Sequence, residues 1–114
     1  SVAVCDTPAG KYEFYGFVKH TDGTPLGERR GDAPQFDPGV YREGDTVYLY
    51  TGFCPADNDT VCGSTVTILA PDMLTVINEP KTIIPNARHA AGTSFEGHAF
   101  FEASSMRRRN DICY

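Results

Sequence analysis

The chain has 114 residues, of which 40% are hydrophobic and 22% are charged, and its formal net charge is −5. This balance is typical of a folded chain and excludes a disordered one, and the length predicts a single domain over residues 1–114. The negative charge argues against a general attraction to nucleic acid or acidic membranes, and the apolar runs are too short to cross a bilayer.

Short extended segments separated by Pro and Gly dominate the chain. Residues 44–52 alternate Val47 and Leu49 with Tyr48 and Tyr50, which predicts a strand covered on both faces. No window has the apolar spacing of a long helix, although residues 100–109 are compatible with one or two helical turns. In chain order, the predicted strands lie within residues 11–19, 44–52, 64–70, 73–79, 81–84 and 93–103.

About six short strands joined by such turns predict an all-β fold, a small antiparallel β-sandwich or barrel. The four cysteines allow three pairings, among which sequence alone does not choose. Their spacing favours a bridge from Cys54 to Cys62, which would close a local loop, and one from Cys5 to Cys113, which would tie the two ends. Two disulfides imply an oxidising compartment. Together with a start at Ser1 instead of Met, they predict a secreted protein.

The longest stretch without a strand pattern, residues 23–44, contains Arg30, Gly31 and Asp32, the tripeptide that integrins read. Integrin recognition requires this tripeptide at an exposed tip, and the simpler interpretation is a charged, solvated loop. Long loops on small β scaffolds often carry binding. We therefore expect the contact surface to include Arg29, Arg30, Asp32 and Tyr41.

The loop between Cys54 and Cys62 allows three interpretations. Asn58 begins an acceptor sequence for N-glycosylation. Asp57 and Asp59 are weak candidates for calcium ligands, because the other ligands of a calcium loop are missing. The interpretation that we favour is an ordinary polar turn. The sequence predicts neither a metal nor a cofactor.

One group of residues has catalytic potential. If residues 93–103 are extended, Glu96, His98 and Glu102 project from one face, and a carboxylate beside an imidazole is suited to general acid–base catalysis. Arg88, one loop earlier, could hold a phosphate. The interpretation that we favour is the solvent face of an edge strand.

The terminal cysteines, Cys5 and Cys113, together with His98 resemble those of the fungal guanyl-specific ribonucleases. This resemblance implies RNA cleavage with His98 as acid or base, Glu96 as its partner and Arg88 as the phosphate clamp. It covers little else. That family has an early helix and a catalytic Glu on a central strand, whereas residues 11–19 look extended here and residues 46–52 contain no acid.

Because no complete active site is visible, we expect a small secreted binding protein without catalysis. Its type would be an effector, toxin or inhibitor that contacts a protein partner outside the cell through exposed loops. The alternative is a small secreted ribonuclease, for which nucleic acid would be the substrate.

Overall fold

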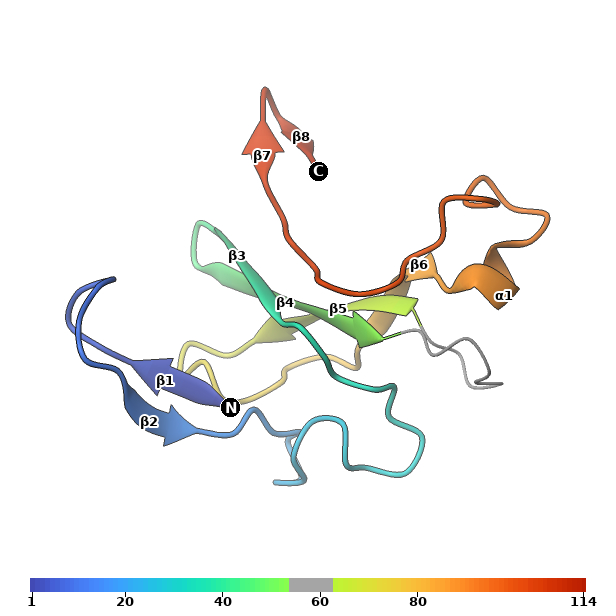
Figure 1. Ribbon diagram of the computed structural model, residues 1–114. Coiled ribbons are helices and arrows are strands. Elements are labelled where there is room, and N and C mark those ends of the chain that lie inside the picture. The colour runs from blue at the N-terminus through green and yellow to red at the C-terminus, as the bar shows by residue number, and fades with distance from the viewer. Residues whose placement is uncertain (54–62) are drawn as a thin grey trace.

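The computed structural model describes residues 1–53 and 63–114 and is mostly β with antiparallel sheets (Figure 1). The single helix of these residues has one turn, and none of their helices is long and apolar enough to cross a membrane. In chain order, the elements are β1 (Val2–Val4), β2 (Glu13–Gly16), β3 (Gly39–Glu43), β4 (Thr46–Phe53), β5 (Gly63–Leu69), β6 (Lys81–Pro85), α1 (Ala87–Ala90), β7 (Arg108–Arg109) and β8 (Ile112–Cys113).

The centre of the molecule is a four-stranded antiparallel sheet in the order β3-β4-β5-β6. In β4, Val47 and Leu49 are buried and the alternate Tyr48 and Tyr50 are half-buried, so the predicted strand is confirmed with both faces partly covered. The sheet is a meander in which each strand pairs with the next one along the chain. This order follows from short connections between antiparallel neighbours.

The hydrophobic core on this sheet is small. Its buried members are Val47, Leu49, Leu69 and Val76, against which half-buried Val18, Leu26 and Met73 pack. Toward the other end of β4 and β5 the interior is polar, and the hydroxyls of Thr51 and Thr65 lie 2.9 Å apart in a buried hydrogen bond. Apolar burial is therefore concentrated at one end of the sheet.

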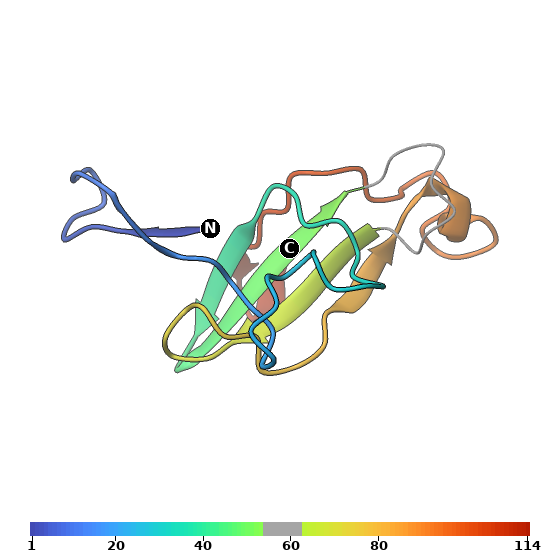
Figure 2. The ribbon, with the colours of Figure 1, turned by 90° about the horizontal axis from the view of Figure 1, so that it is seen from below.

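Two hairpins lie outside the central sheet. The β1–β2 hairpin extends away from it in Figure 2, and the β7–β8 hairpin stands off it in Figure 1. β1 pairs with β2 and β7 pairs with β8, each as a separate two-stranded antiparallel sheet. The all-β class is confirmed. The predicted number of about six strands is wrong, because the described residues form eight strands in three sheets.

Two of the predicted strands do not form. Residues 73–79 make turns with isolated bridges at Thr75 and Val76. Residues 91–97 are turns because Gly92 (φ 72°) and Gly97 (φ 77°) adopt left-handed conformations that interrupt an extended chain. Residues 100–109 contain no helical turn.

The predicted bridge between the ends is absent, because Cys5 and Cys113 are both free. Cys5 follows β1 and Cys113 lies on β8, and the two hairpins that carry them are held apart by the central sheet (Figure 1). The Cys5 thiol donates instead to the Thr7 carbonyl at 2.6 Å. The predicted Cys54 to Cys62 bridge and the glycosylation and calcium interpretations of Asn58, Asp57 and Asp59 lie outside the described residues.

Candidate functional site

The Arg30-Gly31-Asp32 tripeptide turns its carboxylate inward. The Asp32 side chain is 6% exposed and accepts hydrogen bonds from His20 Nε2 at 2.8 Å, from the Gly27 amide at 2.9 Å and from the Arg29 amide at 3.1 Å. Burial by itself would raise the pKa of Asp32, but the hydrogen bonds from His20 and the two amides outweigh it and the pKa is lowered. Asp32 therefore organises its own loop and is not presented to a partner.

Its neighbours surround a polar hollow of about 270 Å³. Arg29 forms a two-pronged ion pair with Glu79, and Arg30 is exposed at the rim. Of the predicted contact residues, Arg29, Arg30 and Asp32 line this hollow, whereas Tyr41 does not. Tyr41 lies on β3 beside Arg108, whose pKa is raised by hydrogen bonds to Asp111 and Tyr41.

The predicted His and Glu face does not form, because residues 91–97 are turns. The Glu96 carboxylate accepts from the Gly92 amide at 3.0 Å and closes its own turn, and His98 is exposed after that turn. Arg88 lies exposed on α1. No strand therefore aligns Glu96, His98 and Glu102 on one face.

Two segments far apart in the sequence run side by side and in the same direction. At one point the Ser104 carbonyl is so close to Gly39 that a Cβ atom on this glycine would be 2.6 Å from its oxygen. Further along, the Arg108 guanidinium donates to the Glu43 carboxylate. The residue numbers differ by 65 in both pairs, so the two segments contact one another at two points in the same order along the chain.

Two residues upstream of the first contact, each segment carries an acid, Asp37 on one and Glu102 on the other. The chain before each acid also meets the same glycine of β4. The Gly52 amide donates to the Phe36 carbonyl at 3.2 Å, and a Cβ atom on Gly52 would lie 2.8 Å from the Phe100 ring. Contacts on both sides of the two acids therefore bring the two segments together.

The two acids differ from most other carboxylates of the described residues. Asp32 and Asp72 accept several hydrogen bonds each, and Glu79 is paired with Arg29, so that the pKa of each is lowered. Asp37 and Glu102 are exposed, and the structure gives them no hydrogen bond or ion pair within residues 1–53 and 63–114. Their carboxylates are thus accessible to a ligand.

Both acids also sit at left-handed turns. Asp37 has φ 46°, and Ala103, directly after Glu102, has φ 62°. Non-glycine residues rarely adopt this conformation, and when they do they are often found at functional sites. The nearby Ser104 hydroxyl is buried without a hydrogen-bond partner in the structure.

Asp37 was not among the residues predicted from the sequence, and Glu102 was predicted only as a neighbour of His98. A signal was present, since an aromatic residue precedes an acid in both Phe36-Asp37 and Phe101-Glu102, and a hairpin follows each pair. Two accessible carboxylates that flank a substrate support acid–base or nucleophilic chemistry. No group of three or more potential metal ligands is found among the residues that the structure describes.

The chain is 60% identical, over all of its 114 residues, to a protein of Thermoclostridium stercorarium named xylosidase/arabinosidase. It spans about a quarter (24%) of the length of this relative. No protein-family model and no solved structure matches the chain.

This similarity overturns the functional prediction from sequence. A segment with such identity to an enzyme named for glycoside cleavage is not an effector, toxin or inhibitor, and the prediction of a small binding protein without catalysis is wrong. The ribonuclease alternative falls with it, because the free Cys5 and Cys113 also remove the disulfide that the resemblance required.

Proposed function

We propose that the chain is a segment of a glycoside hydrolase that cleaves xylosides or arabinosides, and that Asp37 and Glu102 belong to its active site. The identity to the xylosidase/arabinosidase supports the reaction class. The contact of Gly39 with Ser104, two residues after each acid, is the observation that carries the assignment of the two acids.

Most glycoside hydrolases use two Asp or Glu residues that flank the scissile bond. One acid protonates the departing glycosidic oxygen. The other either activates water or attacks the sugar as a nucleophile. Asp37 and Glu102 meet the basic requirement for this chemistry, since both are accessible and come from neighbouring segments. Other groups of the site would come from the rest of the enzyme, because the relative is about four times longer than this chain.

Three other acids of the described residues are poorer candidates. Asp32 is buried against His20, Asp72 caps the turn at Leu74 and Thr75, and Glu79 is held by Arg29. An acid that must exchange a proton with a substrate has to reach it. These three carboxylates are instead engaged in holding the structure together.

A segment-swapped enzyme tests the reaction class. In it, the 114 residues replace the part of the Thermoclostridium stercorarium protein to which they align along their whole length. We expect this enzyme to release nitrophenol from 4-nitrophenyl xyloside or 4-nitrophenyl arabinoside. A swapped enzyme that melts cooperatively but hydrolyses neither substrate would contradict the proposal.

Substitutions in the swapped enzyme test the two acids. We expect Glu102→Gln and Asp37→Asn each to lower kcat by about 10²-fold or more, because a positioned acid or base contributes on this scale. The matched controls are Glu13→Gln and Asp6→Asn, at exposed acids of the β1–β2 hairpin. They should leave kcat close to that of the parent.

The thermal midpoint separates a chemical from a structural effect in these variants. Asp37 and Glu102 have no partner to lose within the described residues, so their substitution should leave the midpoint unchanged. If kcat stays within a few fold of the parent in both variants, the two acids are not catalytic. Should the swapped enzyme fail to fold, the same substitutions at the aligned positions of the relative provide the measurement.

A further inference from the structure

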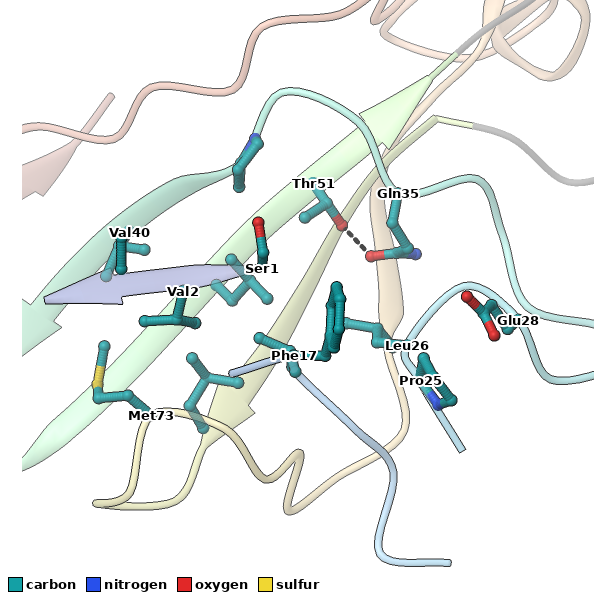
Figure 3. A pocket seen from close by; sticks show the side chains of 15 residues that line it. Ser1, Val2, Phe17, Pro25, Leu26, Glu28, Gln35, Val40, Thr51 and Met73 are labelled. Carbon is teal, nitrogen blue, oxygen red and sulfur yellow. Dashed lines mark hydrogen bonds between the residues drawn. The ribbon is translucent and has the colours of Figure 1, made fainter. Parts of the chain in front are cut away.

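A large apolar groove lies between β1 and the face of the central sheet (Figure 3). Its volume is about 520 Å³. Its floor includes Leu49 and Leu69 of the buried core, and its walls come from β1, β3 and the chain after β2 and β5. The wall side chains include Val2, Phe17, Leu26, Val40 and Met73.

The groove is open to solvent, so its apolar walls remain in contact with water. Removing such surface from water is favourable, and an occupant of the groove would do so. The polar side chains of the lining are those of Ser1, Glu28, Gln35 and Thr51. The Thr51 hydroxyl donates to the Gln35 side chain, so that these two groups satisfy one another (Figure 3). The groove therefore fits an apolar occupant.

The surface of the whole chain leads to the same conclusion. Its accessible area is 7815 Å², against about 6,200 Å² for a compact monomer of 12.5 kDa. Its radius of gyration is 15.0 Å, against about 13 Å for a compact domain of this length. On the β1–β2 hairpin, Tyr12, Phe14 and Tyr15 are all exposed. Several large apolar side chains left in water on one hairpin are typical of a surface that another element covers.

The strand arrangement indicates which kind of element is missing. A two-stranded hairpin is marginally stable in water unless further strands or a packed layer support it. The β1–β2 hairpin has no third strand within the described residues, yet it forms one wall of the groove. A β-strand that pairs beside the hairpin would support it and cover the apolar walls of the groove.

We propose that the groove is the docking site for an apolar β-segment from the part of the same polypeptide that lies outside residues 1–114. This inference rests on the proposed function, in which the chain is a segment of a longer enzyme. Three quarters of the relative's length lies outside the matched segment and is the source of the occupant. The net charge of −5 disfavours a second copy of the chain in this place.

The first experiment compares the 114-residue chain with the segment-swapped enzyme. A dye that fluoresces on exposed apolar surface, 8-anilinonaphthalene-1-sulfonate, should bind the isolated chain strongly and the swapped enzyme weakly. Light scattering should find the isolated chain monomeric. An isolated chain that binds no dye, or a dimer whose formation abolishes dye binding, would overturn the proposal.

The second experiment places a polar group in the groove. Val40 lies on β3, is 54% exposed in the chain and lines the groove. Val40→Thr keeps the β-branched shape but adds a hydroxyl. We expect it to reduce dye binding by the isolated chain while its thermal midpoint stays unchanged. In the swapped enzyme the same change should lower the midpoint by at least about 2 °C, because there the side chain is buried.

Ile77→Thr is the matched control, since Ile77 is 58% exposed and does not line the groove. It should change neither dye binding nor the midpoint. Equal effects of Val40→Thr in the isolated chain and the swapped enzyme would contradict docking. If the swapped enzyme does not fold, the substitution at the aligned position of the relative replaces it.

These readouts do not depend on activity. An inactive swapped enzyme that shows the Val40 effect would reject the proposed function alone. An active enzyme without that effect would reject the docking site alone.

Discussion

At the scale of single residues, the direction of a side chain decides what a short motif can do. Arg30, Gly31 and Asp32 are adjacent in a long loop, so the sequence left recognition of this tripeptide by integrins as one possible interpretation. The fold turns Asp32 toward His20 and toward the amides of Gly27 and Arg29. The carboxylate thus acts as a cap for its own loop, since hydrogen bonds to a charged acceptor are among the stronger ones.

This arrangement predicts a local dependence on pH. The pKa of Asp32 is lower in the folded than in the unfolded chain, where an Asp titrates near 3.9. Its contribution to stability is therefore complete above about pH 4 and is lost as the pH falls through the lower, folded pKa. Hydrogen exchange of residues 26–32 in the segment-swapped enzyme measures this effect.

At pH 7, Asp32→Asn should lower the opening free energy of this loop by about 1–3 kcal/mol, because donors are left without their charged acceptor. The difference from the parent should shrink below about pH 4, because the Asp32 carboxylate of the opened loop is protonated there and opening then costs the parent less free energy. The exposed Asp6→Asn is the control and should leave exchange of this loop unchanged at any pH. A difference that is constant from pH 7 to pH 3 would rule out this role of Asp32.

At the scale of elements, a glycine allows the two acid-bearing segments to meet. A Cβ atom on Gly39 would lie 2.6 Å from the Ser104 carbonyl oxygen and 3.1 Å from its carbon, and this backbone cannot move aside cheaply. Gly39→Ala should push the segments apart. A displacement of about 1 Å at an active site can reduce the rate by roughly 10²-fold, so we expect kcat of the segment-swapped enzyme to fall on that scale.

Gly16→Ala is the control for this prediction. Its Cβ atom would meet only the end of the Leu74 side chain, at 2.8 Å, and such a flexible group can turn away. We expect kcat to be retained in Gly16→Ala. Similar rates for Gly39→Ala and Gly16→Ala would mean that the close approach of Ser104 has no part in the chemistry.

At the scale of the whole molecule, the separation of the two hairpins predicts the state of the terminal cysteines. Cys5 and Cys113 are free, and Cys113 is exposed. Maleimide labelling of the isolated chain without reductant, followed by peptide mapping, should find label on both residues. Recovery of a peptide in which Cys5 is joined to Cys113 would contradict this layout. The secreted location that the cysteines suggested stays a prediction.

The sequence by itself determined the β class and the position of the central strands. Alternation in residues 44–52 and β-branched side chains in residues 64–70 are local signals, and β4 and β5 formed where they predicted. Local signals wrongly predicted a strand in residues 93–103, because the left-handed conformations of Gly92 and Gly97 interrupt the extended chain. The spacing of the cysteines wrongly predicted a bridge from Cys5 to Cys113, which are both free.

Only the tertiary structure decided the candidate site and the groove. Asp37 and Glu102 lie on two segments that meet at Gly39 and Ser104 and again at Glu43 and Arg108, a contact between distant parts of the chain that no periodicity encodes. The inward turn of Asp32 depends in the same way on His20, which lies twelve residues earlier. The groove arises from the way that β1 stands over the sheet. The periodicity of a strand indicates which side chains share one face of that strand. How the strands pack against each other depends on the whole chain.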